Sequence, residues 1–149
     1  MKGLIPAAGL GTRLRPLTYN RPKPLLNVAN KPIIAYAIEN LRDAGITDIG
    51  LIVSEAVRAA LESEALEIPG VSLKLILQKD QLGIAHAVRQ AGDWLEGEDF
   101  CVYLADNLFE TGVKRYVENF LQNHCDAVIG LVRVPVSYTH LTLPTKRIV

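Results

Sequence analysis

The sequence predicts an α/β fold, a Rossmann-like α/β/α sandwich with a mainly parallel sheet. Two observations predict it. Short apolar runs alternate along the chain with segments whose apolar residues recur at helical spacing. Glycine or proline stands at several of the boundaries, as at Gly45, Pro69-Gly70 and Gly83. Because helices separate the strands, we expect right-handed crossovers and parallel strands with helices on both faces.

The first half of the chain is predicted to hold three strands and two helices. Residues 2–6 form the first strand. A helix starts at Pro32, which suits the first helical position, and ends at Gly45. Its apolar residues at helical spacing are Ile34, Ala37, Ile38, Leu41 and Ala44. A second strand over 49–53, a second helix over 55–66 and an alternating third strand over 71–77 follow.

The second half continues the alternation up to about residue 132. A helix opened by Gly83 places four apolar residues on one face: Ile84, Val88, Ala91 and Leu95. A fourth strand over 100–105, an amphipathic helix over 113–121 and a fifth strand over 127–132 complete the pattern. Residues 136–149 have no helical period and no predicted place in the sheet.

Composition sets mild limits on function. The 149 residues are about one domain, and 49% hydrophobic with 21% charged residues is typical of a soluble globular protein. A net charge of zero argues against a nucleic-acid partner. Neither a signal-peptide core nor a membrane-length apolar run occurs, so we expect no membrane partner and a cytoplasmic location. Cys101 lies in an apolar run, which favours a buried free thiol.

Positive charge is concentrated near the N-terminus. Six basic residues precede the first acidic one, Glu39: Lys2, Arg13, Arg15, Arg21, Lys23 and Lys31. A glycine-containing turn among such cations suits a bent polyanion, above all a nucleoside triphosphate. The turn follows the first strand, residues 78–83 follow the third, and Asp106-Asn107 follows the fourth. Ligands of parallel sheets bind at such carboxyl ends, so we expect these three loops to converge.

Several interpretations compete for these residues. A dinucleotide loop needs a third glycine where Leu14 stands, and a P-loop needs Gly-Lys-Ser/Thr, which Gly11-Thr12-Arg13 lacks. The glycine turn could also be purely structural. Asp106 could be a turn or capping residue, and Gln78 alone could be a solvated loop residue.

A set of motifs makes the choice more specific. They are Ala8-Gly9-Leu10-Gly11-Thr12-Arg13-Leu14, Lys23-Pro24-Leu25-Leu26, Gln78 with Leu82-Gly83-Ile84-Ala85, and Leu104-Ala105-Asp106-Asn107. Over residues 2–135 the chain resembles the sugar-1-phosphate nucleotidyltransferase family, and within it most closely the glucose-1-phosphate thymidylyltransferases. The resemblance implies a glycosyltransferase-A-like version of the predicted fold. It also implies transfer of a nucleoside monophosphate from dTTP to a sugar 1-phosphate such as glucose 1-phosphate, giving a dTDP-sugar and pyrophosphate.

The resemblance also assigns roles. Arg13 and Lys23 are the catalytic cations, and Asp106 binds Mg²⁺ together with a carboxylate from later in the fold. The nucleotide-binding residues are Ala8, Gly9, Gly11, Thr12, Arg13, Gln78 and Gly83. The partners are a nucleoside triphosphate (dTTP or UTP) and a sugar 1-phosphate, and the parent protein is expected to be a homo-oligomer.

The chemistry agrees with these roles. The attacking phosphate oxygen is already anionic, so alignment of two anions and charge neutralisation suffice, without a nucleophilic side chain. The three histidines form no cluster in the sequence, and we expect them to be non-catalytic: His86, His124 and His140.

Departures from the family pattern leave two points open. Ala8 stands where the thymidylyl group usually has Gly, and Gln81 replaces a common Pro, so a UTP-dependent glucose-1-phosphate uridylyltransferase stays an alternative. Ala105 also replaces a Gly. Family members are longer, so we expect residues 1–135 to be the N-terminal part of the domain and residues 136–149 to be a non-native or divergent tail. A chain lacking the later carboxylate could be a non-catalytic nucleotide-binding module.

Overall fold

The structure is a computed structural model that describes residues 1–64 and 66–131. Its main sheet has four parallel strands in the order β5-β4-β1-β6. The strands are β1 (Lys2–Pro6), β4 (Asp48–Val53), β5 (Ser72–Leu77) and β6 (Phe100–Val102). In register, Gly3 of β1 lies between Ile49 of β4 and Cys101 of β6. The predicted α/β fold with a parallel sheet is therefore confirmed.

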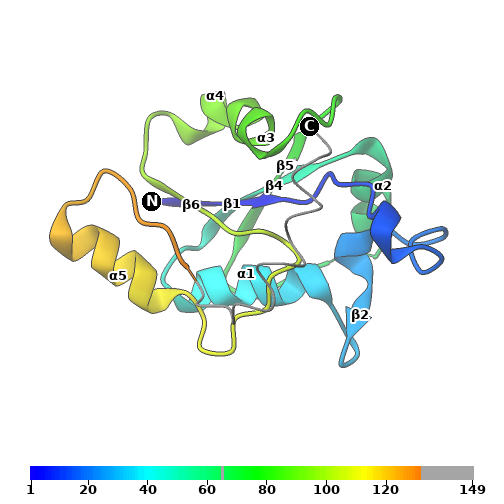
Figure 1. The fold of residues 1–149 in the computed structure, drawn as a ribbon, viewed down its shortest axis with the longest axis horizontal. Coiled ribbons are helices and arrows are strands. Elements are labelled where there is room, and N and C mark those ends of the chain that lie inside the picture. Colours follow the sequence, from blue (N-terminus) through cyan, green and yellow to red (C-terminus); the bar gives the residue numbers. More distant parts are fainter. Residues whose placement is uncertain (65, 132–149) are drawn as a thin grey trace, which may run out of the picture.

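Helices cover both faces of this sheet (Figure 1). They are α1 (Ile33–Asp43), α2 (Glu55–Glu64), α3 (Ile84–Gln90), α4 (Gly92–Leu95) and α5 (Lys114–Asn123). Figure 1 shows α3 and α4 on one side of the sheet and α1 and α5 on the other. Val57 and Leu61 of α2 belong to the same buried cluster as the apolar face of α1. The protein thus has the three layers that the sequence predicts.

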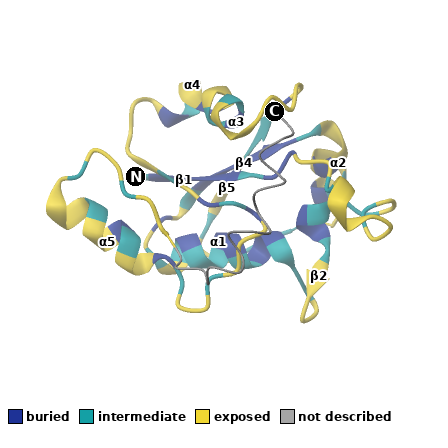
Figure 2. Cartoon of the chain, viewed as in Figure 1, coloured by how far each residue is buried: buried dark blue, intermediate teal, exposed yellow. Residues whose placement is uncertain are grey.

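Successive strand residues fill two different cores, because side chains alternate across a strand. Leu4 packs with Ala87, Ala91 and Leu95 of the α3–α4 layer, whereas Ile5 packs against the α1 layer. Both residues are fully buried, and Figure 2 shows the dark blue buried segments along β1 and β4. The two cores fix the ends of the strands and therefore the loops that follow them.

The boundaries of two predicted helices differ from the observed ones. Pro32 precedes α1 instead of opening it, and it belongs to β3 (Lys31–Pro32), which pairs with β2 (Asn27–Val28) in a small antiparallel ribbon. Ala91, with φ −91° and ψ 0°, separates α3 from α4 within the segment predicted as one helix.

The last two predicted strands also differ from the structure. The fourth strand, predicted over 100–105, ends at Val102. Tyr103 still donates its N–H to the Leu4 carbonyl, but its hydroxyl bonds to the Asn107 carbonyl in the loop that follows. The fifth strand, predicted over 127–132, was wrong for the described residues 127–131. Ile129 is 77% and Leu131 81% exposed there. The apolar run is therefore not paired in the sheet over these residues, and an apolar run alone does not make a strand.

Three further expectations concern the rest of the chain. Cys101 is a free, half-buried thiol whose pKa is raised by burial, in line with its predicted place in an apolar run. No helix in the described part of the chain is long and apolar enough to span a membrane. The predicted tail, residues 136–149, lies outside the described residues.

Candidate active site

A cavity of about 370 Å³ opens at the carboxyl ends of the strands. Its lining comes from the end of β1 and the loop after it, from the 3-10 turn η2 (Lys23–Leu25), from the segment between β5 and α3, and from the loop after β6. The predicted residues in the lining are Ala8, Gly9, Lys23, Gln78, Gly83 and Asp106. The three loops that the sequence predicts to converge therefore do so.

Gln78 anchors one wall of the cavity. Its backbone N–H donates to the Val53 carbonyl at 2.8 Å, and only 4% of its surface is exposed. Its Nε2 lies 2.9 Å from Nδ1 of His86, whose Nε2 lies 3.2 Å from Nε2 of Gln90. Gly83 caps α3 with φ +96°, a conformation that favours glycine. This wall is held by directional hydrogen bonds.

Lys23 and Asp106 form the charged part of the lining, where they make an ion pair through Nζ and Oδ2. Their side chains are 29% and 44% exposed, so the pair faces solvent and adds little to stability. A phosphorylated ligand would therefore meet an ammonium group and a carboxylate side by side.

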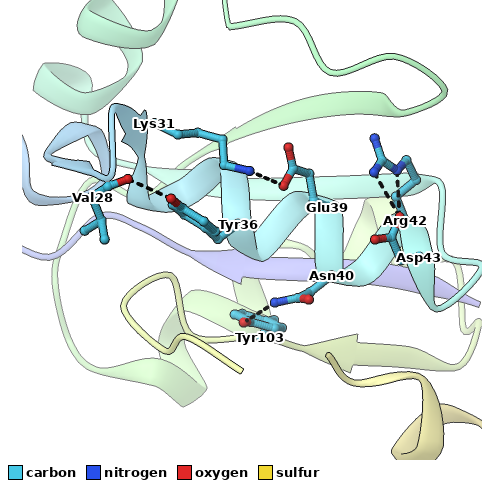
Figure 3. A network of polar contacts seen from close by, with 8 residues as sticks. All are labelled: Val28, Lys31, Tyr36, Glu39, Asn40, Arg42, Asp43 and Tyr103. Carbon is cyan, nitrogen blue, oxygen red and sulfur yellow. Dashed lines mark hydrogen bonds and ion pairs between the residues drawn. The ribbon is translucent and has the colours of Figure 1, made fainter. Parts of the chain in front are cut away.

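Tyr103 fastens the loop that carries Asp106. Its hydroxyl donates to the Asn107 carbonyl at 2.8 Å. The same hydroxyl accepts from Nδ2 of Asn40 at 3.0 Å (Figure 3). Burial raises the pKa of the phenol, which keeps it protonated and able to donate. Phe109 packs edge-on against the ring at 5.4 Å. Helix α1 therefore fixes this loop through Asn40.

Gly11 lets the cationic loop pack against Lys23. Its φ is +63°, and a Cβ there would lie 2.9 Å from Cβ of Lys23 and 3.1 Å from Cγ2 of Thr18. The Thr18 hydroxyl donates to the Gly11 carbonyl at 2.9 Å. Glycine is thus required by both backbone conformation and space.

The other predicted loop residues lie outside the lining. Gly11 is half-buried against Lys23, and Thr12 and Arg13 lie on η1 (Thr12–Leu14), where both are exposed. Arg13 makes no ion pair with any residue in 1–64 or 66–131. Arg21, in contrast, is tied to Glu64 of α2 at 2.8 Å. The structure therefore brings Lys23 to the cavity and leaves Arg13 exposed outside the lining.

Asp106 is the carboxylate in the cavity lining. Within the described residues, no three His, Cys, Asp or Glu side chains are grouped as a ready-made metal site. Mg²⁺ at phosphate sites commonly takes one or two carboxylates and completes its shell with phosphate oxygens and water. One exposed carboxylate in the lining of a cavity of about 370 Å³ fits that kind of site.

Sequence reasoning missed His86, Gln90 and Tyr103. His86 and Gln90 are four residues apart and so share a face of α3, which was a signal that they could interact. Nothing in the spacing of the residues indicated that Tyr103 would bond to both Asn40 and Asn107.

Cationic residues, a glycine turn and a carboxylate at the carboxyl ends of parallel strands are typical of α/β proteins that bind phosphorylated ligands. The model of the nucleotidyl transferase family matches residues 2–139. The chain therefore belongs to the nucleotidyl transferase family.

Three similar proteins support this assignment. A low-salt glycan biosynthesis nucleotidyltransferase of Haloferax volcanii is 41% identical over 136 residues, 90% of this chain and 38% of that protein. A glucose-1-phosphate thymidylyltransferase of Streptomyces griseus is 40% identical over 139 residues, 91% of this chain and 38% of that protein. A solved UDP-glucose pyrophosphorylase complexed with UDP-glucose has a TM-score of 0.71 and 29% identity over 83% of this chain and 54% of that chain. The chain thus spans about 38% of the length of the curated relatives.

Proposed function

We propose that the complete protein transfers a nucleoside monophosphate from dTTP to a sugar 1-phosphate, for which we take glucose 1-phosphate, with release of pyrophosphate. The observation that carries the proposal is the meeting of Lys23, Gln78 and Asp106, from three separate loops, in one cavity. The motifs that carry these three residues support the proposed roles, and the similarity to a thymidylyltransferase supports the choice of nucleotide.

The lysine and arginine neutralise phosphate charge in this proposal. Lys23, which lines the cavity, contacts the transferring phosphoryl group in this proposal, where such a cation stabilises the charge that develops. Arg13 acts from its exposed turn and contacts the outer phosphates. Gly9, Gly11 and Thr12 supply backbone N–H groups near the phosphates, and Ala8 lines the nucleoside end.

The base lies against the opposite wall. Gln78 and Gly83 contact its edge, because they are the lining residues on the β5–α3 side. Asp106 would hold Mg²⁺, which when bound supplies further neutralisation of phosphate charge. Asp106 pairs with the Lys23 ammonium, so Mg²⁺ would share this carboxylate with Lys23.

A second candidate nucleotide is UTP. Ala8 and Gln81 depart from the thymidylyl pattern, and the structural similarity to a UDP-glucose pyrophosphorylase supports a uridylyltransferase equally well at the level of the fold. A non-catalytic nucleotide-binding module is the alternative for residues 1–149 alone, because residues 1–64 and 66–131 supply a single carboxylate to the cavity lining.

We further propose that residues 1–135 are the N-terminal part of the catalytic domain of a cytoplasmic, homo-oligomeric enzyme, and that residues 136–149 are not native to it. Sequencing the parent locus past codon 135 tests the boundary. A continuous native reading frame through residue 149 would contradict it.

The function is tested by binding and turnover together. Calorimetric titration of the 149-residue chain with dTTP and with UTP, each with Mg²⁺, should show binding of the preferred nucleotide. The complete protein should convert labelled dTTP and glucose 1-phosphate to dTDP-glucose. Binding without turnover by the complete protein would favour the non-catalytic module, and absence of both would refute the proposal.

A further inference from the structure

The hydrogen bonds around His86 cannot all be satisfied as the amide nitrogens are placed. Nε2 of Gln78 faces Nδ1 of the ring at 2.9 Å, and Nε2 of Gln90 faces the other ring nitrogen at 3.2 Å. A neutral imidazole has one donor and one acceptor nitrogen, so it accepts from only one amide. One of the two glutamines must therefore turn its oxygen toward the ring.

The two glutamines differ in their freedom to turn. Gln78 is 4% exposed, whereas Gln90 is exposed at the end of α3. The amide oxygen and nitrogen have nearly the same shape, and their assignment follows from the network. The exposed amide of Gln90 is the one that turns. Nδ1 of His86 then accepts from Gln78, and its Nε2–H donates to Oε1 of Gln90.

This arrangement decides what Gln78 offers to a ligand. One of the two N–H groups of its amide donates to His86, and its Oε1 accepts no hydrogen bond from the described residues, although the side chain lines the cavity. A carbonyl oxygen is an acceptor only. With the amide held in this orientation, its acceptor oxygen and its remaining N–H donor are offered to a ligand in a fixed order, which suits a donor beside an acceptor and disfavours the reverse order.

We propose that His86 is a positioning residue that fixes the orientation of the Gln78 amide and thereby selects imide bases, thymine or uracil, against cytosine. Thymine and uracil carry an N–H at ring position 3, where cytosine has an acceptor nitrogen and, beside it, an amino donor in place of a carbonyl. The inference rests on the proposed function, because it takes the β5–α3 wall as the side that contacts the base. It leaves dTTP and UTP equivalent, since both present the same N–H.

The test compares dTTP with dCTP, which differ at this edge and in the 5-methyl group, and repeats the comparison with UTP and CTP, which share the unmethylated ring. The 149-residue chain is titrated calorimetrically with each nucleotide in excess Mg²⁺. The unmodified chain should prefer the imide base by about tenfold, as one mismatched hydrogen bond implies. In His86→Leu the Gln78 amide is free to turn, so the preference should fall to within about twofold.

Two further variants distinguish a loss of Gln78 orientation from a general loss of nucleotide affinity. In His86→Asn a side-chain oxygen can take the place of Nδ1, so much of the preference should return. Arg89→Gln alters the exposed neighbour of His86 on α3 and should change affinity for both nucleotides alike, leaving their ratio intact.

The outcomes distinguish this inference from the proposed function. If the unmodified chain binds no nucleotide, the proposed function fails and the inference fails with it. If it binds, but without preferring the imide base, the inference alone is overturned. An unchanged preference in His86→Leu also overturns it, whereas loss in the leucine variant with recovery in the asparagine variant supports it.

Discussion

The two walls of the cavity are built in different ways. On the β5–α3 wall, Gln78 is 4% exposed and joins a chain of polar contacts through His86 to Gln90. On the cationic side, Lys23 makes a solvent-facing ion pair and Arg13 lies on an exposed turn. One wall is fixed by directional bonds, whereas the other presents charge from a loop.

This difference agrees with what the proposed function asks each wall to recognise. A hydrogen bond weakens steeply when its angle is poor, so a wall that reads a base edge needs its side chains held in place. Charge attraction depends mainly on distance and tolerates a range of directions. An exposed loop therefore suffices for phosphates, at the expense of sensitivity to salt.

The largest effect is expected from removing the cation in the cavity. Lys23→Ala in the complete protein should lower kcat/KM by about 10²- to 10³-fold, because it removes charge stabilisation at the transferring group. The measurement is formation of labelled dTDP-glucose. Lys114→Ala, on α5 with 67% of the side chain exposed, is the matched control and should be neutral. Equal rates for the Lys23 variant and the unmodified protein would contradict its role.

A smaller effect is expected from the exposed turn. Arg13→Ala should lower kcat/KM by about tenfold, because an exposed cation is partly screened by solvent. Arg15 lies two residues away, with its guanidinium 5.3 Å from the Tyr19 ring, and serves as the control. Arg15→Ala should have a clearly smaller effect in the same turnover assay. If the two variants behave alike, the turn acts through its summed charge and Arg13 has no specific role.

The packing of Gly11 on Lys23 connects loop conformation to the site. Gly11→Ala should lose about 1 kcal/mol of stability from its positive φ and also weaken dTTP binding severalfold, because its Cβ would displace Lys23. Gly45 has φ +86° with nothing within 4 Å of a Cβ, so Gly45→Ala carries the backbone cost alone. Thermal unfolding and dTTP titration of both variants make the comparison. Equal loss of dTTP affinity in the two would show that the contact with Lys23 is unimportant.

How much was predictable from the sequence depends on whether a feature is local. The positions of β1, α1, β4 and β5 follow from apolar periodicity and glycine stops, and the loops at their ends follow from topology. The strand predicted over 127–132 failed because pairing needs a neighbour that periodicity does not reveal. His86 was expected to be non-catalytic, and its contact with Gln78 depends on how α3 docks on the sheet. The resemblance assigned Arg13 a role, yet Arg13 lies outside the cavity lining because of the fold of its turn, which the motif does not reveal.

The smallest expected change tests the comparison most directly. Raising the ionic strength from about 0.1 M to about 1 M shortens the Debye length from about 10 Å to about 3 Å. Affinity for dTTP should then fall severalfold, because the cationic wall is exposed. The ratio of dTTP to dCTP affinity should change by less than about twofold, because the bonds around the buried Gln78 are hardly screened. Calorimetric titrations of both nucleotides at the two salt concentrations measure the affinity and the ratio in one series. A preference that fell in step with affinity would mean that base selection also depends on the charged loop, and the two walls would then act as a single unit.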